Sequence, residues 1–463
     1  MIPNYTTETG EEYTMIKLKK PIAVWLAATA LLLTAGCGKD GNLTHKEQTK
    51  TASSAMINKT TLVCGTMALS DELKDAVITF NKTNMEYQIV LRDYGEEEDP
   101  VTKMNADIAA GNAPDIIDLV NIPVEQYAAK GLLEDLTPYF EKDSELAIED
   151  VIDSVLEGMK TDGKLYYVAP RYTIWTLGGH ARDVGDGNGW NFAECKSLLE
   201  QQEDDVRPFY YENKSDILYS ILGNGLTDFV DWQTGECSFD SEEFRDILEL
   251  CNKGSDEKTD YSRDGIRMIQ EGKILFIEGQ ITLHEVFEQE KLYGEDINYI
   301  GYPNKEKMGS YFQFDTRIGM YSKSKGKAGA WEFIRTFMTK EYQGKQMKNS
   351  ETPTRQDCLD MVIRALTTTE RYTDEFGRII TPQSGSMGYE NGTEIEITPI
   401  TQKQVDKYCS LLNHTRKSGG SDSTMMRIIM EEVKPYFEGE KSLEQTTEIM
   451  QKRIRTYVNE NRF

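Results

Sequence analysis

The residues that could support metal or acid–base chemistry lie in patterns that each lack a required member. The segment HEVFE (284–288) begins as a zinc-protease helix does, but Glu288 stands where the second histidine must lie. The GSMG segment at Gly385 lacks the five-residue elbow that exposes a nucleophilic serine, and no glycine-rich phosphate loop is present. Only 4 histidines occur in 463 residues. The sequence therefore predicts no catalytic centre, no metal site and no cofactor.

Two further groups of potential metal ligands lead to the same expectation. In DVGDGNGW (183–190) the acidic residues do not follow the order of an EF-hand, and the glycines predict a turn. The acidic run 96–99 is typical of a solvated loop. The cysteines after Cys37 are scattered without CxxC or metal-ligand spacing, so we expect buried thiols, although spacing leaves disulfide pairing open.

Cys37 follows an apolar segment near the start of the sequence. The apolar run 22–33 is shorter than the about 20 residues that a membrane-spanning helix needs. Lysines at 17, 19 and 20 precede it and small residues follow, which is the order of a secretory signal peptide. We therefore expect residues 1–36 to be a signal peptide, with translation starting at Met15 because the preceding residues are acidic.

The residues before Cys37 resemble the lipobox of bacterial lipoproteins. The segment is TAGC (34–37), with Thr34 in the position that usually holds leucine. This resemblance implies cleavage before Cys37, attachment of diacylglycerol and palmitate, and anchoring on the outer face of the bacterial cytoplasmic membrane. Residues 37–60 would form a flexible tether. The alternative is an ordinary signal peptide in which Cys37 has no special role.

Composition and charge limit the classes of partner. With 38% hydrophobic and 28% charged residues, the chain can form one large or two medium globular domains. A formal net charge of −26 repels phosphate backbones and anionic headgroups. We therefore expect no nucleic-acid binding and no membrane contact other than the lipid anchor.

The first part of the globular region has the pattern of an α/β protein. Residues 61–63 predict a buried strand, and Ser70 precedes a helix with apolar residues at helical spacing. Alternating apolar residues at 87–91 predict the next strand, so a right-handed βαβ unit and a parallel sheet follow. A second amphipathic helix ends at Gly111, and DIIDLV (115–120) reads as another strand.

Several segments resemble extracellular solute-binding proteins, family 1, which are the capture subunits of ABC importers. AGNAPDIIDL (110–119) and YAAKGLLEDLTPYFEKD (127–143) resemble the N-terminal lobe. Further stretches are similar in the expected order: DGKLYYVAP (162–170), GWNFAECKSLLEQ (189–201), NYIGYPNKEKMGS (298–310), SKSKGKAGAWEFIRTFMTKEYQ (322–343) and EEVKPYFEGEKSLEQTTEIMQKRIRTYVNE (431–460). The resemblance covers nearly all of the chain after the tether.

The resemblance implies a two-lobe periplasmic-binding-protein-like (type II) α/β fold. Each lobe would be a mostly parallel sheet flanked by helices, with the ligand in a cleft between lobes that closes on binding. We expect lobe 1 in 61–169 plus 312–350, and lobe 2 in 170–311 plus 351–463. The implied function is capture of a carbohydrate, an oligosaccharide, by a monomer that delivers it to ABC permease subunits. Two alternatives are a lipid-anchored glycan hydrolase and a binding protein for a solute other than sugar.

The same resemblance nominates cleft residues, because a sugar site combines flat aromatic rings with polar side chains. PRYTIWTLGG (170–179) lies where the family crosses between lobes, and PFYYENKSDILYSILGNG (208–225) is similar to the second lobe's contribution. Met67 and Asn121 follow predicted strands of the first lobe, at the edge where ligands of open α/β sheets bind. The predicted ligand-binding residues are Met67, Asn121, Arg171, Tyr172, Trp175, Tyr211, Asn213, Asp216, Tyr219, Tyr311 and Phe312.

Packing is the competing interpretation of most of these residues. Strand alternation places Tyr172 and Trp175 on opposite faces, so both rings can meet one ligand only if the strand bends. Tyr311 and Phe312 also suit strand packing, and an exposed helix face explains Asp216 and Tyr219 equally well. Two other tryptophans are expected in the core, Trp190 and Trp331, and Trp232 is expected in the cross-strand packing of a hairpin. Residues 276–287 lack a tryptophan that the family often has there, which leaves the size and class of the ligand open.

Overall fold

The computed structural model describes the part of the chain that follows the predicted tether. The described residues are 59–203, 205–209, 213–254, 264–346, 352–389, 391–419 and 422–462. The predicted signal peptide and the predicted lipidation site at Cys37 lie outside them. No helix in the described ranges combines the length and the apolar character that crossing a membrane requires.

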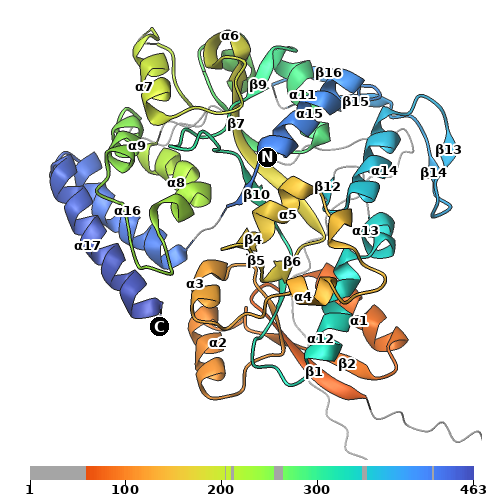
Figure 1. Ribbon diagram of the computed structural model, residues 1–463. Coiled ribbons are helices and arrows are strands. Elements are labelled where there is room, and N and C mark those ends of the chain that lie inside the picture. Colours follow the sequence, from red (N-terminus) through yellow and green to blue (C-terminus); the bar gives the residue numbers. More distant parts are fainter. Residues whose placement is uncertain are drawn as a thin grey trace, which may run out of the picture. The chain divides into compact units, whose positions relative to one another are not determined.

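The first sheet has five strands in the order β2-β1-β3-β11-β6 (Figure 1). Strand β1 (Thr60–Thr66) pairs in parallel with β2 (Tyr87–Asp93) and β3 (Ile116–Asp118). Strand β11 (Ile318–Met320) runs antiparallel between β3 and β6 (Tyr167–Val168). The predicted βαβ unit and the DIIDLV strand are therefore confirmed.

Helix α1 (Asp71–Thr83) connects β1 to β2 and forms for the reasons read from the sequence. The Ser70 hydroxyl caps it by accepting the Leu73 N–H at 3.1 Å. Its apolar residues at helical spacing are all buried, namely Leu73, Ala76, Val77 and Phe80. Helix α2 (Pro100–Ala109) begins with a proline in its first turn, and Gly111 follows it with a φ of 79°.

The second sheet is organised around β7 (Arg171–His180), its longest strand. Strands β12 (Thr352–Pro353), β10 (Tyr311–Gln313), β8 (Ile277–Ile281) and β9 (Ile297–Tyr299) all pair antiparallel with β7. Only β17 (Lys417–Ser418) adds a parallel pairing, with β10. The expectation of a mostly parallel sheet in each lobe is wrong for this sheet. The physical reason is clearest at β10: β7 enters the sheet from the first sheet, whereas β10 leaves toward it, so the two strands run in opposite directions.

The chain passes between the two sheets at three places. The passages join β6 to β7, β10 to β11, and α13 (Lys340–Gln346) to β12. The expected lobe boundary at 312 falls inside β10, whose Phe312 pairs with Ile174 of the second sheet. The second passage therefore lies between Gln313 and Ile318.

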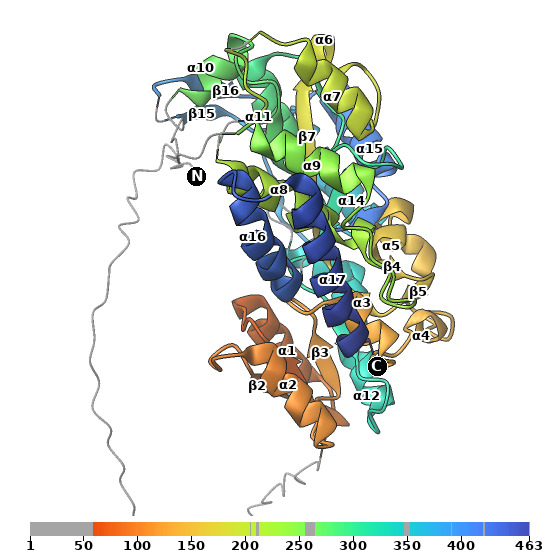
Figure 2. The same ribbon diagram turned by 90° about the vertical axis from the view of Figure 1, so that its left-hand side faces the viewer.

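Helices cover both faces of the second sheet. One face packs against four helices: α8 (Lys214–Gly225), α9 (Glu242–Asn252), α16 (Ser423–Phe437) and α17 (Leu443–Asn461). These helices contact one another and lie at the left of Figure 1. Figure 2 shows α16 and α17 running along each other in front of α8. The opposite face packs against α5 (Asp153–Met159), α11 (Leu283–Tyr293), α14 (Gln356–Thr367) and α15 (Gln402–His414).

The remaining described elements are short or peripheral. The helices are α3 (Val124–Ala129), α4 (Thr137–Phe140), α6 (Ala181–Val184), α7 (Phe192–Glu200), α10 (Gly265–Gln270) and α12 (Lys327–Ile334). The 3₁₀ turns are η1 (Ile148–Asp150), η2 (Leu226–Phe229) and η3 (Arg335–Met338). Three two-stranded ribbons pair β4 (Lys160–Thr161) with β5 (Lys164–Leu165), β13 (Tyr372–Thr373) with β14 (Ile379–Ile380), and β15 (Gly385–Gly388) with β16 (Glu394–Ile397).

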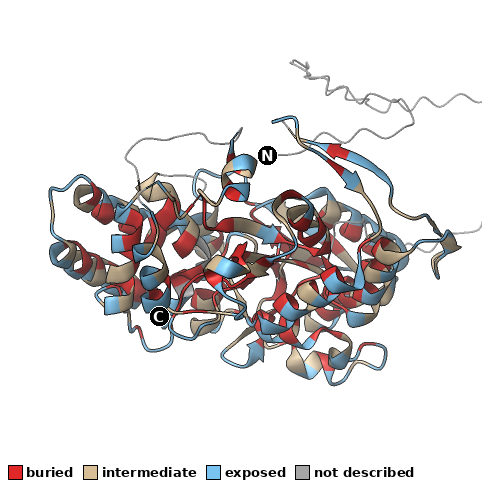
Figure 3. Cartoon of the chain, turned by 90° about the horizontal axis from the view of Figure 1, so that it is seen from above, coloured by how far each residue is buried: buried red, intermediate tan, exposed pale blue. Residues whose placement is uncertain are grey.

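The buried side chains form two cores, and Figure 3 shows them concentrated along the strands and on the inner faces of the helices. The first core runs from the first sheet to the Tyr172 face of β7, and the second lies between the opposite face of β7 and the α8–α17 group. Trp190, Trp232 and Trp331 are 4%, 6% and 9% exposed, which confirms them as packing residues. The described cysteines are free thiols, and four of them are buried.

Candidate functional site

Polar side chains collect at the carboxyl edge of the first sheet, where β1, β2 and β3 end side by side. The Thr66 hydroxyl donates to Asp118 Oδ2 at 2.9 Å, and the Val120 N–H donates to Oδ1 at 3.3 Å. Burial raises the pKa of Asp118, and the Thr66 hydrogen bond partly opposes the rise. A buried carboxylate therefore holds the ends of β1 and β3 together at this edge.

The two residues predicted here differ in accessibility. Met67 is 8% exposed and follows Thr66, whose hydroxyl also accepts the Ala68 N–H at 3.1 Å. Asn121 is exposed and has a φ of 61°, a left-handed conformation that asparagine tolerates better than most residues. Asn121 thus presents its amide to solvent just beyond Asp118. Ligand contact by either residue stays a prediction.

The start of β7 has one buried and one half-buried face, which confirms the predicted separation of Tyr172 from Trp175. Tyr172 and Ile174 are buried, whereas Arg171, Thr173 and Trp175 between them are half-buried. The Trp175 indole N–H donates to the side-chain oxygen of Gln313 on β10. The same oxygen accepts Nε2 of the exposed Gln280 on β8 at 3.1 Å. We call Trp175, Gln280 and Gln313 the β7 platform: a flat ring edged by two amides.

An ion pair joins the half-buried face of β7, which carries Arg171 and Trp175, to helix α1 of the first lobe. Arg171 shares this face with Trp175, and its guanidinium pairs with Glu72 in the first turn of α1. Helix α1 begins a few residues after Met67, at the carboxyl end of β1. The contact therefore brings the β7 platform to the same side of the molecule as the carboxyl edge of the first sheet.

Three predicted aromatic residues lie in the cores. Tyr172 is 2% exposed, its hydroxyl lies 2.9 Å from that of Tyr408, and its ring meets Phe312 edge-on at 5.3 Å. Tyr311 is 2% exposed and donates to Asp228 Oδ2 at 3.1 Å, while Phe312 is fully buried. All three have the packing role weighed as their alternative, and ligand contact by them stays a prediction.

The candidates on α8 surround its N-terminus. Asn213 caps the helix by accepting the N–H groups of Ser215 and Asp216 at 3.0 and 3.3 Å. Asp216 is half-buried in the first turn, and Tyr219, one turn further on, is 58% exposed. Tyr211 lies outside the described residues.

A second buried carboxyl lies beside the β7 platform. Glu278 of β8 pairs with Leu177 of β7, two residues from the Trp175–Gln280 pair on the same face. It accepts hydrogen bonds from the hydroxyls of Ser220 on α8 and Tyr302. Burial raises the pKa of Glu278 to about 7, and the Tyr302 hydrogen bond opposes the rise. Glu278 thus connects the sheet to the helix that carries Asp216 and Tyr219.

Two hollows lie away from the β7 platform. One, of about 490 Å³, is lined by Asp228, Glu243, Asn304 and Lys417 among others, so Tyr311 reaches it through its bond to Asp228. The other, of about 940 Å³, lies beside the C-terminal end of α1 and is lined by Tyr139 and Trp331. That end of α1 leads into the start of β2, at the edge of the first sheet opposite to Asp118.

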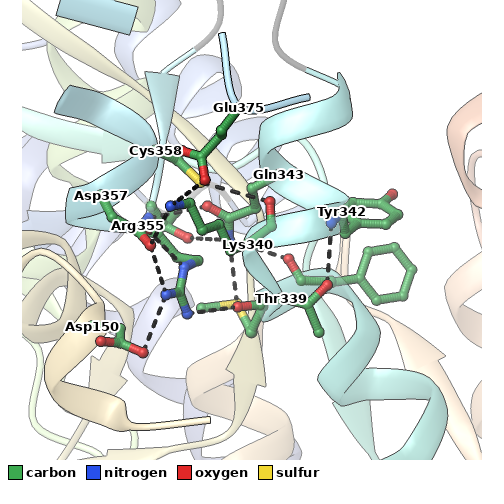
Figure 4. A network of polar contacts seen from close by, with 12 residues as sticks. Asp150, Thr339, Lys340, Tyr342, Gln343, Arg355, Asp357, Cys358 and Glu375 are labelled. Atoms are coloured by element: carbon green, nitrogen blue, oxygen red, sulfur yellow. Dashed lines mark hydrogen bonds and ion pairs between the residues drawn. The ribbon is translucent and has the colours of Figure 1, made fainter. Parts of the chain in front are cut away.

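A polar network joins the elements on either side of the third passage (Figure 4). Arg355 is 7% exposed, and its guanidinium contacts Asp150 at 3.1 Å, Asp357 at 2.9 Å and the Met338 carbonyl at 3.3 Å. Gln343 of α13 accepts the Arg355 N–H at 3.0 Å, so α13, β12 and α14 are held to one another. Burial raises the pKa of Asp357, but the Arg355 guanidinium outweighs this effect and keeps the pKa below its ordinary value.

The sequence interpretation missed several polar residues of the β7 platform and of the carboxyl edge of the first sheet. Four of them lie within strands, where the sequence pattern gives alternation but does not identify the neighbouring strand. They are Thr66, Asp118, Gln280 and Gln313. Arg317, at the start of β11, is half-buried, and no acceptor in the described residues contacts its Nε. Its neighbour Leu119 donates to its carbonyl at 2.7 Å, which places it at the same edge as Asp118. The sequence analysis gave no signal at Arg317.

Comparisons with known proteins agree with the fold. A family model described as bacterial extracellular solute-binding protein matches residues 75–368, more than half of the chain. The ABC substrate-binding protein Lmo0181 from Listeria monocytogenes, solved in complex with cycloalternan, is 17% identical and covers 87% of this chain and 100% of its own, with a TM-score of 0.51. The sugar-binding protein MalE from Xanthomonas citri is 14% identical and covers 87% and 98%, with a TM-score of 0.51.

A third solved structure, an extracellular solute-binding protein family 1 from Alicyclobacillus acidocaldarius, is 14% identical. It covers 86% of this chain and 98% of its own, with a TM-score of 0.50. At these identities the likeness concerns the fold. The described chain therefore has the two-lobe α/β fold of periplasmic binding proteins, with one sheet in each lobe.

Proposed function

The chain belongs to the bacterial extracellular solute-binding proteins, and on this premise we propose that it captures a carbohydrate, an oligosaccharide, for an ABC importer. Members of the family act outside the cytoplasm and bind solutes. The finer statements, namely the sugar, the permease that receives it and the lipid anchor at Cys37, are our proposal. The lobe division at the three passages belongs to the proposal as well.

The β7 platform is the observation that carries the choice of a sugar. A pyranose ring presents C–H groups on its face and hydroxyls around its rim. Trp175 offers a half-buried aromatic face, and the amides of Gln280 and Gln313 can donate to and accept from hydroxyls at its edge. The complex of Lmo0181 with cycloalternan and the sugar-binding protein MalE, which share this fold, support the same ligand class.

Delivery would depend on a hinge at the three passages. A closed arrangement would let one solute touch Trp175 of lobe 2 and Asn121 of lobe 1 together. Binding would therefore shift the equilibrium toward closure, and the permease would recognise the closed form. We propose that the protein acts as a monomer, held at the membrane through Cys37.

Titration calorimetry against a panel of oligosaccharides, with chromatography of the products, tests the function. We expect saturable heat with at least one sugar and no cleavage products. Product formation would identify a glycan hydrolase instead, and an absence of heat across the panel, with heat for another solute class, would refute the sugar.

Paired variants localise the site. Trp175→Ala should weaken sugar binding by about tenfold, which corresponds to the worth of one aromatic contact. Tyr139→Ala is the matched control, because Tyr139 is a half-buried ring in the 940 Å³ hollow of the first lobe. If Tyr139→Ala weakens binding and Trp175→Ala does not, the site lies in that hollow.

The anchor is tested separately by growing cells with labelled palmitate. We expect label on the wild-type protein and none on Cys37→Ser, which should also leave the membrane fraction. Labelling of both proteins would contradict lipidation at Cys37.

A further inference from the structure

One carboxylate contacts the chain at or beside all three passages between the lobes. Glu72 Oε2 pairs with the Arg171 guanidinium, where the first passage enters β7, and accepts from the Thr316 hydroxyl in the second passage at 3.4 Å. Its Oε1 accepts the Tyr342 hydroxyl at 3.0 Å, on α13 directly before the third passage. The three partners are far apart in sequence and meet at Glu72.

The surroundings of Glu72 strengthen its polar contacts. It lies in the first turn of α1, where the positive end of the helix dipole stabilises an acid. Its side chain is 13% exposed and that of Arg171 is 28% exposed, so the pair is largely shielded from solvent. A charge-assisted hydrogen bond in such a place is stronger than one at an open surface.

The Tyr342 contact is separate from the Arg355 network on the same helix. Figure 4 shows the Tyr342 ring pointing away from Arg355, while Gln343 next to it points into that network. Helix α13 therefore contacts Arg355, at the start of α14, through Gln343, and it reaches Glu72 through the preceding residue, Tyr342. The Arg355 network joins α13 to the start of α14, whereas Glu72 connects α13 to the other two passages.

We propose that Glu72 is the positioning residue of the hinge: it links the three interlobe passages and thereby sets the balance between lobe arrangements. Lobe rotation must act on the Arg171 pair, because Glu72 belongs to α1 of the first lobe and Arg171 begins β7 of the second sheet, while Thr316 and Tyr342 hold the same carboxylate from beside the other two passages. Glu72 also stands in the helix that follows Met67, and Arg171 shares a strand face with Trp175. Occupation of the β7 platform is thus coupled to the hinge through this carboxylate. The link to ligand binding rests on the proposed function; the link to lobe arrangement does not.

The test is the distance between the lobes in the protein without added sugar. Dyes attached to unnatural residues at Ile78 of α1 and Lys452 of α17, both exposed, report it by single-molecule energy transfer. We expect Glu72→Gln to shift or broaden the distribution relative to wild type. Tyr342→Phe, which removes one of the three contacts and keeps the ion pair, should cause a smaller change in the same direction.

Two controls separate this role from local stability. Glu134→Gln removes a carboxylate that likewise accepts a tyrosine hydroxyl, from Tyr139 at 3.1 Å, and pairs with a lysine, Lys327, but entirely within lobe 1. Asp71→Asn removes an exposed charge from the same helix turn. Both should give the wild-type distribution. A Glu72→Gln distribution that superimposes on wild type, with folding intact by circular dichroism, would overturn the inference.

A binding arm completes the test. For whichever sugar gives saturable heat with the wild type, Glu72→Gln should change the dissociation constant by about tenfold, since the apparent affinity follows the population of the competent state. An unchanged constant would overturn the coupling to ligand. If no sugar binds the wild type, the proposed function fails, while the energy-transfer result still decides the hinge role.

Discussion

Glu278 provides the sharpest quantitative prediction, because its pKa is displaced into the range of ordinary buffers. Burial among Ser220, Tyr302 and the strand raises this pKa from 4.5 to about 7. A carboxyl whose pKa rises on folding stabilises the fold below its unfolded-state pKa and loses that contribution as pH rises through the folded value. Wild-type stability should therefore fall between pH 5 and pH 8 by about 2 to 3 kcal/mol from this residue alone.

Glu278→Gln isolates the effect, since glutamine resembles the protonated acid and still accepts from Ser220 and Tyr302. Urea denaturation followed by tryptophan fluorescence should find similar stability for both proteins at pH 5. At pH 8 the variant should be more stable by about 2 to 3 kcal/mol. Tyr302→Phe removes the hydrogen bond that lowers the pKa, so the pH-dependent loss should move to higher pH. Parallel stability curves for wild type and Glu278→Gln over this range would refute the reasoning.

Three further predictions concern stability elsewhere. Arg355→Met should lower the free energy of unfolding, measured in urea, by about 3 kcal/mol, because the acceptors around Arg355 in Figure 4 would lose their charged donor. An unchanged free energy of unfolding would contradict a structural role for that network. Asp143→Asn should cost about 2 kcal/mol at pH 7. Burial raises the pKa of Asp143, but the Arg335 guanidinium outweighs this effect and keeps the pKa below 3.8. The loss of stability caused by Asp143→Asn should therefore shrink as acid protonates Asp143 in the wild type. A loss that does not depend on pH would contradict this. Trp190→Ala should cost about 3 to 5 kcal/mol by thermal or urea denaturation while leaving sugar affinity intact in the folded protein, the reverse of Trp175→Ala.

Local patterns predicted the parallel part of the first sheet, but not its antiparallel strands β11 and β6. The βαβ unit could be predicted because its signals lie in short segments. These signals are the Ser70 cap, the apolar spacing of α1 and the alternation of β2. The second sheet was not predicted correctly, because β10 and β12 reach it from distant parts of the chain. Pairing with β7 depends on those passages, and no local pattern records the direction in which a strand arrives.

The same limit explains the site. Alternation correctly separated Tyr172 from Trp175, but it could not say which face of β7 is covered. Tyr172 is buried by Tyr408, which lies 236 residues later in the chain. Glu72 carried only the signal of an acid in a first helical turn, which suits any helix. Its role became visible when Arg171, Thr316 and Tyr342 were found around one carboxylate.

The most direct measurement is a crystal structure of the protein with an oligosaccharide that gives saturable heat in calorimetry. The account predicts a sugar ring stacked on the indole of Trp175, hydroxyls bonded to Gln280 or Gln313, and a contact from Asn121 across the cleft. A sugar bound in the hollow beside Tyr139 and Trp331, with Trp175 free of ligand, would contradict it.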